Sequence, residues 1–144
     1  MFSKIAVALN DLPESQRALR TAIDIARKFD ASLATVSILG DPPAYTSFAT
    51  LVDPGAAAAM REDRRRLQSL LHEEATKLAH EHGVSATSAI VEGRETQAIL
   101  HFLREQKADL LVIGLHQHDF YVSRLWSSVY DVAQDAPCSV LGVH

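Results

Sequence analysis

The chain contains one cysteine, Cys138, among its 144 residues. A single thiol excludes an intramolecular disulfide, and its place at the start of an apolar segment indicates a buried structural thiol. Long hydrophobic runs are also missing, because no segment reaches the roughly 20 apolar residues that a membrane span needs. The N-terminal stretch MFSKIAVAL has too short an apolar run for a signal peptide and is typical of a strand. We therefore expect a soluble, cytoplasmic protein without membrane attachment.

An excess of positive charge is absent as well. The chain has 14 Lys and Arg residues against 18 Asp and Glu residues, for a formal net charge of −4. Because phosphate contacts require concentrated Lys and Arg, we expect no nucleic acid partner. Catalytic signatures are missing too: the sequence has no G-x-S-x-G elbow and no paired acidic motif. The sequence therefore predicts a protein that is not an enzyme.

The chain does contain a regular alternation of short apolar runs and segments with helical periodicity. Its length predicts one domain, residues 1–144. Apolar runs predict strands at 3–9, 32–39, 84–91, 109–114 and 138–143, and apolar spacing predicts helices at 13–29, 56–82, 96–106 and 125–134. Strands that alternate with helices pair in parallel. We predict an α/β three-layer sandwich, Rossmann-like, with a five-stranded parallel sheet and helices on both faces.

The long predicted helix at 56–82 carries two patterns. Its expected buried stripe consists of Met60, Leu67, Leu71, Ala75 and Leu78. A basic run on the same helix has acidic neighbours at the spacings of a helical ion-pair face, and a partner-binding surface is the alternative: the basic residues are Arg61, Arg64, Arg65 and Arg66, and the acidic ones are Glu62, Asp63, Glu73 and Glu74. The histidines of the helices, His72, His80, His82 and His101, are expected at the surface or at the boundary of the core.

In an open parallel sheet, ligands bind beyond the carboxyl ends of the strands, where the order of the strands reverses. The segments that follow the predicted strands, 10–12, 39–41, 93–95 and 115–123, should form the rim of such a pocket. Unpaired backbone N–H groups between a strand and a helix can bind phosphate, but the backbone must be free to approach it. The loop after 109–114 has almost no glycine beyond Gly114, and Phe120, Tyr121 and Trp126 add bulk.

The same loop contains His116, His118 and Asp119, and His144 ends the sequence. An H-x-H-D cluster carries donor types that bind divalent metals. Such a short stretch seldom supplies a complete site, and no other ligand is implied by the spacing. We therefore predict no metal site and interpret these side chains as solvated or hydrogen-bonded.

Four segments, KIAVALNDLPESQRAL, VEGRETQAIL, DLLVIG and APCSVLGV, resemble the universal stress protein family, and the resemblance covers essentially the whole chain. It implies the adenine nucleotide alpha hydrolase-like form of the fold and a regulatory or protective function in stress. Nucleotide-binding members carry a G-x-x-G-x9-G-[ST] loop after the fourth strand. Registered on Gly114, the second glycine falls on Gln117, the third on Ser127, and the hydroxyl position on Ser128.

The resemblance also marks two positions at other strand ends. The acidic residue that family members place after the first strand is Asn10 here, and the backbone position that meets the base is Ile38. The candidate nucleotide pocket thus comprises Asn10, Ile38, Gly114, His116, Gln117, Ser127 and Ser128. Ser127 and Ser128 are also expected near a helix N-terminus, where they could cap it.

Gln117 puts a side chain where the backbone should approach phosphate, and it adopts positive φ less freely than glycine. The stretch HQHDFYVSRLWSS is similar to the UspA-type branch, whose members are not regarded as ATP binders. The resemblance therefore implies no cofactor and weak or absent ATP binding, with the loop a packed connector. Two alternatives remain: a switch that binds ATP or AMP, with or without slow hydrolysis, and a protein-interaction module with a regulatory protein partner.

The last predicted strand (138–143) begins at Cys138, ends at Val143 and is expected at a sheet edge. An exposed apolar edge promotes association unless it is paired. Family members pair this strand with its copy across a two-fold axis, which agrees with the edge argument. We therefore expect a homodimer formed through this strand.

Overall fold

The computed structural model describes residues 1–40, 51–115 and 122–144, and for 122–128 it describes the backbone alone. Its strands form one sheet with all neighbours parallel, in the order β3-β2-β1-β4-β5. Their bounds are β1 Lys4–Ala8, β2 Ser32–Leu39, β3 Ala86–Glu92, β4 Leu110–Gly114 and β5 Ser139–Val143. The predicted five-stranded parallel sheet is confirmed.

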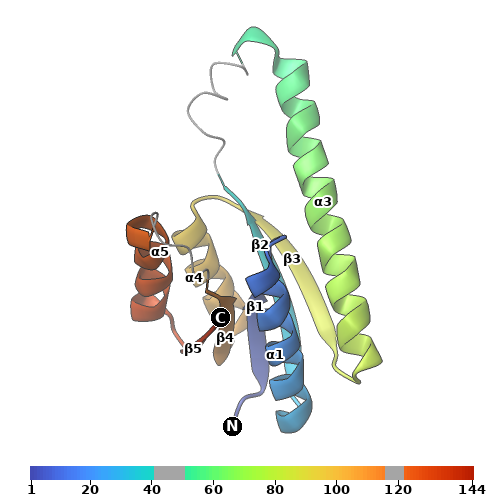
Figure 1. Ribbon diagram of the computed structural model, residues 1–144, viewed down its shortest axis with the longest axis vertical. Coiled ribbons are helices and arrows are strands. Elements are labelled where there is room, and N and C mark those ends of the chain that lie inside the picture. Colours follow the sequence, from blue (N-terminus) through green and yellow to red (C-terminus); the bar gives the residue numbers. More distant parts are fainter. Residues whose placement is uncertain (41–50, 116–121) are drawn as a thin grey trace.

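Helices cover both faces of this sheet (Figure 1). They are α1 Pro13–Phe29, α3 Pro54–Glu81, α4 Glu95–Gln106 and α5 Val122–Asp135. One buried cluster joins α1 and α3 to the sheet, and a second cluster on the other face contains Phe102 and Leu103 of α4 and Val132 of α5. The three-layer α/β sandwich is therefore confirmed, with the predicted element order. Among the described residues, no helix is long and apolar enough to cross a membrane.

The central strand β1 is buried on both faces. Ile5, Ala6 and Val7 are fully buried, and Ile5 lies in register between Leu33 of β2 and Leu110 of β4. A parallel strand between two helical layers has no solvated face, which explains its continuous apolar run.

Asp109, just before β4, ties the amino ends of β1 and β4 together. Its carboxylate accepts hydrogen bonds from the Ser3 amide and hydroxyl, both at 2.8 Å, and from the Lys4 amide at 3.1 Å. Partial burial acts to raise the pKa of the Asp109 carboxyl, but the donated bonds outweigh it, and the pKa lies below its ordinary value.

The long helix α3 differs from the prediction in its buried stripe. Leu71, Ala75 and Leu78 contact the core as expected, but Met60 is 60% exposed and Leu67 is 68% exposed. The reason is length: α3 has 28 residues, and its N-terminal part extends past the end of the sheet (Figure 1). Helical periodicity predicts which side of a helix is apolar, but it carries no information on where the neighbouring layer ends.

The prediction that the arginines of α3 pair with acidic residues of the same helix is also wrong. Arg61 and Arg65 both bind Glu92 at the end of β3, at 2.7 and 3.0 Å. The arginines therefore join α3 to the edge strand, and no ion pair within α3 is present among the described residues. Pro54 and Gly55, assigned to a loop from sequence, begin the helix, and the Asp53 carboxylate caps it by accepting from the Ala56 amide.

Candidate functional site

The carboxyl ends of the strands form one edge of the sheet, and the strand order reverses at β1, which lies between β2 and β4. Beyond this edge the segments remain bonded to one another: the Leu9 amide donates to the Val36 carbonyl at 2.8 Å, and the Leu115 amide to the Val143 carbonyl at 2.6 Å. This is the position at which open α/β sheets bind ligands. The structure brings Asn10, Ile38 and Gly114 to this edge, as the sequence predicted.

Asn10 is exposed and forms part of the turn from β1 to α1. Its side-chain oxygen accepts from the Leu12 amide at 2.9 Å, and its own amide donates to the Ser15 hydroxyl at 2.9 Å. Ser15, which is buried, in turn donates to the Ala8 carbonyl at 3.3 Å. The amide oxygen of Asn10 thus has a structural role in this turn.

Gly114 lies against the first turn of α1. A Cβ at this position would lie 2.6 Å from the carbonyl carbon of Glu14 and 2.7 Å from its oxygen, too close for any side chain. The glycine is therefore required for the approach of α1 to β4, whether or not an anion binds. The side chain of Glu14 is only 15% exposed, and it contacts the Arg17 guanidinium at 3.6 Å. The backbone and Cβ of Glu14 thus lie next to the residue at which the predicted phosphate loop begins.

Ser127 and Ser128 lie inside α5, five and six residues after Val122, the first residue of that helix. The expectation that they lie at a helix N-terminus is wrong, because α5 begins more than a turn earlier. The free amides of a helix belong to its first turn, so the backbone of these serines is not part of an amide cradle.

His116 and Gln117, together with the residues of the H-x-H-D hypothesis, lie outside the residues that the structure describes. In the described part of the chain, no three His, Cys, Asp or Glu side chains are grouped to hold a metal ion.

The sequence prediction missed one polar cluster altogether. His72 of α3, expected at the surface or boundary, is 3% exposed and lies over β2. Its Nδ1 lies 2.7 Å from the Thr35 hydroxyl and its Nε2 lies 2.8 Å from the Ser37 hydroxyl. Ser37 donates to the Leu9 carbonyl at 2.8 Å, and the Thr35 hydroxyl lies 3.4 Å from the Thr87 carbonyl. Burial lowers the pKa of His72.

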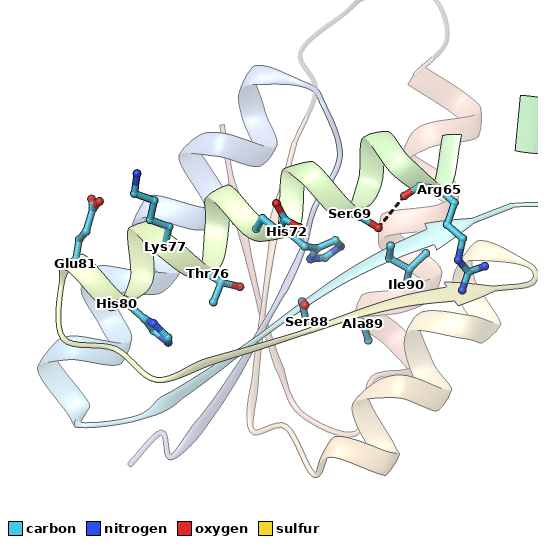
Figure 2. A pocket seen from close by; sticks show the side chains of 11 residues that line it. Arg65, Ser69, His72, Thr76, Lys77, His80, Glu81, Ser88, Ala89 and Ile90 are labelled. Carbon is cyan, nitrogen blue, oxygen red and sulfur yellow. Dashed lines mark hydrogen bonds between the residues drawn. The ribbon is translucent and has the colours of Figure 1, made fainter. Parts of the chain in front are cut away.

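His72 also reaches a groove of about 1070 Å³ between α3 and the edge strand β3 (Figure 2). Thr76 and His80 of α3 point towards β3, whereas Lys77 and Glu81 point away from it. The groove lies on a face of the sheet and is distinct from the edge that carries Asn10 and Gly114.

A signal for this cluster was present in the sequence. Thr35 and Ser37 alternate with apolar residues in β2, so both side chains lie on the same face of this strand. Buried hydroxyls need partners, and a polar residue on the covering helix is the natural source. His72 is three residues before Ala75, in the stripe that faces the sheet.

Cys138 is half-buried just before β5. Burial raises the pKa of its thiol, and the negative charge of Asp109 acts in the same direction. The neutral thiol is therefore favoured, as expected for a structural cysteine.

An α/β sandwich whose strand order reverses beside an exposed carboxyl edge is typical of nucleotide-binding and related regulatory domains. The chain belongs to the universal stress protein family, whose model matches residues 1–144. Universal stress protein C of Salmonella typhimurium is 30% identical over 140 residues, which cover 97% of this chain and 94% of that protein.

Solved structures agree with this assignment. A universal stress protein family member from Burkholderia pseudomallei superposes with a TM-score of 0.71 and 25% identity, covering 98% of this chain and 95% of that one. A universal stress protein in complex with cAMP superposes with a TM-score of 0.75 and 24% identity, covering 99% of this chain and 97% of that one. The second comparison establishes a common fold.

Proposed function

We propose that this chain is a cytoplasmic, non-catalytic regulatory protein of the stress response, acting as one domain and binding ATP weakly or not at all. The observation that carries the proposal is the packing of Glu14 on Gly114. This contact accounts for the one glycine that matches the family's phosphate loop without any phosphate.

Electrostatics support the same conclusion. Glu14 adds a carboxylate to the first turn of α1, next to the strand end at which a triphosphate would bind, and like charges oppose each other. The positions of Ser127 and Ser128 inside α5 also leave them without the amide cradle that a glycine-rich loop would add.

The direct test is calorimetric titration of nucleotide-free protein with Mg-ATP, AMP and cAMP. We expect an ATP dissociation constant weaker than about 1 mM, a binding free energy smaller in magnitude than about 4 kcal/mol. A micromolar constant for ATP would contradict the proposal. Mass spectrometry of small molecules released from freshly purified, gently denatured protein gives an independent check.

Glu14→Gln tests the electrostatic part of the argument, with Glu62→Gln on the exposed part of α3 as the matched control. Glu14 is only 15% exposed and its charge is partly balanced by Arg17, so we take the removal of this charge to be worth roughly 1 kcal/mol, and E14Q should tighten residual ATP binding by about threefold to tenfold. E62Q should leave it unchanged. Equal weak binding by E14Q and the parent protein would show that charge at this position has no influence on ATP.

The second candidate is a switch that binds an adenine nucleotide, favoured by the structural similarity to a protein solved with cAMP. It would use Asn10 and Ile38 for the base and Gly114, Ser127 and Ser128 for phosphate. Under this hypothesis Ser128→Ala weakens nucleotide binding, and equal affinity of S128A and the parent protein excludes the phosphate role. A protein-interaction module is the third candidate, and it requires a regulatory partner whose binding ignores nucleotide.

A further inference from the structure

The hydrogen bonds around His72 assign its neutral tautomer. Ser37 donates its hydroxyl proton to the Leu9 carbonyl, so its oxygen accepts from Nε2–H of the ring. The Thr35 hydroxyl lies farther from its own carbonyl partner, 3.4 Å from that of Thr87, so we assign its proton to the hydrogen bond with Nδ1, which accepts at 2.7 Å. Every polar atom of the ring is satisfied in this arrangement, as buried polar groups require.

The cluster is a large part of what attaches α3 to the sheet. The buried residues of this 28-residue helix are His72, Ala75 and Ala79, and the two alanines are small. Leu67 and Leu70, five and two residues before His72, are exposed. Leu71 and Leu78 also pack against the core but are only partly buried. A change in the charge of His72 therefore acts on one of the three buried side chains of α3.

Among the described residues, no acidic side chain forms an ion pair with His72. The groups bonded to the ring are the hydroxyls of β2, and β3 contributes only Ser88, Ala89 and Ile90 to the groove. The ionisable side chains that line the groove belong to α3: Arg65, Glu73, Lys77, His80 and Glu81. Arg65 is bound to Glu92 of β3, and among the described residues none of these groups forms an ion pair with His72.

We propose that His72, Thr35 and Ser37 form a proton-responsive latch, which holds α3 on the sheet at neutral pH and loosens when His72 takes up a second proton. The proton comes from solvent through the groove and binds at Nδ1. Thr35 can then no longer donate to Nδ1, and its hydroxyl proton must turn to the Thr87 carbonyl, 3.4 Å away. The 2.7 Å contact is kept with its direction reversed, because Nδ1–H now donates to the Thr35 oxygen. The cost lies in the charge itself, which is buried without an acidic partner among the described residues, and that is unfavourable.

The latch reaches the edge of the sheet as well. Its last bond ends on the Leu9 carbonyl, one residue before Asn10, so the state of His72 also bears on the end of β1. The proposal needs no nucleotide, and it stands or fails separately from the function proposed above.

The sign of the pH effect follows from linkage. The folded-state pKa of His72 lies below the ordinary value of 6.5, so the unfolded chain binds more protons in the interval between the two values. Stability from this group is complete above pH 6.5 and is lost as the pH falls towards the folded-state pKa. One proton of difference raises the unfolding equilibrium constant by up to about tenfold per pH unit in that interval.

The experiment compares urea unfolding from pH 7.5 to pH 4.5 for the parent protein, His72→Gln and the control His80→Gln. Glutamine can donate to Ser37 and accept from Thr35 but does not titrate in this range. Below pH 6.5 the unfolding equilibrium constant of the parent protein should rise by up to about tenfold per pH unit because of His72, and we expect this contribution to be absent in H72Q. His80 is exposed in the same groove, and H80Q should retain the pH dependence of the parent protein. Equal pH slopes for H72Q and the parent protein would overturn the proposal.

Two measurements on the parent protein keep the test decisive if H72Q does not fold. In a titration of the imidazole nitrogens by NMR, His72 should be the Nε2–H tautomer at neutral pH and titrate below 6.5, and titration at or above 6.5 would overturn the proposal. Hydrogen exchange of the amides in 65–79, corrected for the intrinsic rate, should accelerate at pH 5.5 relative to amides of α4. Uniform acceleration in both helices would show that no local latch exists.

Discussion

At the carboxyl end of β4, the backbone of Glu14 leaves no room for a side chain on Gly114. The position was chosen from sequence as the first glycine of a phosphate loop, and the structure supplies a packing reason for the same glycine. Two explanations of one residue are separable by substitution, because a packing role affects the stability of the free protein and a phosphate role affects ligand affinity.

Gly114→Ala should destabilise the protein by about 1–3 kcal/mol, because the added methyl group meets backbone that cannot turn away. The matched control is Gly40→Ala, where an added Cβ meets no described atom within 4 Å, and it should change stability by less than about 0.5 kcal/mol. Urea unfolding at pH 7.5 measures both. Equal stability of G114A and the parent protein would mean that α1 moves away from β4 at little cost.

At the scale of the element, α3 behaves as two segments. Its C-terminal part packs on the sheet through His72 and Ala79, and its N-terminal part extends past the sheet and is tied to β3 by the contacts of Arg61 and Arg65 with Glu92. Exposed ion pairs of this kind contribute roughly 0–1 kcal/mol. The apolar residues of the N-terminal part therefore add little to the stability of the isolated chain.

Leu67→Ala should change the free energy of unfolding by less than about 0.5 kcal/mol, since this side chain is 68% exposed. Leu103→Ala on α4 makes the same chemical change at a fully buried position and should cost about 2–5 kcal/mol. Thermal and urea unfolding of both variants measure the difference. A large loss in L67A alone would indicate that the exposed part of α3 is covered in solution, for example in an oligomer.

At the scale of the whole molecule, the sheet ends in two strands, β3 and β5, each paired on one side only with the described strands of the chain. The predicted edge position of the last strand is confirmed. Leu141 of β5 is 37% exposed, and β5 carries no charged residue that would discourage pairing with another strand. The homodimer through β5 remains a prediction, supported by this edge.

Light scattering after gel filtration should give twice the chain mass of 15.8 kDa for the parent protein. Leu141→Arg should give the single-chain mass, because two arginines would face each other across a two-fold axis. Thr87→Arg, exposed on the other edge strand, is the control and should remain dimeric. A parent protein that runs as a monomer, or an L141R protein that stays dimeric, would rule out this interface.

Local pattern was sufficient for the elements and their order. Short apolar runs predict the strands, helical spacing predicts the helices, and the alternation of the two predicts parallel pairing. Each of these patterns depends on residues that are close in the sequence. The edge at which the strands end followed from the same reasoning, since all parallel strands end on one side, whereas the choice of Ile38 at this edge came from the family resemblance.

Contacts between distant residues could come only from the tertiary structure. His72 is buried because Thr35 and Ser37, 37 and 35 residues away, present hydroxyls under α3. Glu92 of β3 forms ion pairs with Arg61 and Arg65. The spacing along the helix had assigned these arginines to acidic neighbours on α3 itself. Helical and strand periods report which side of an element is apolar, but the depth of a side chain, and the partner it meets, depend on the layer that the rest of the chain places against it.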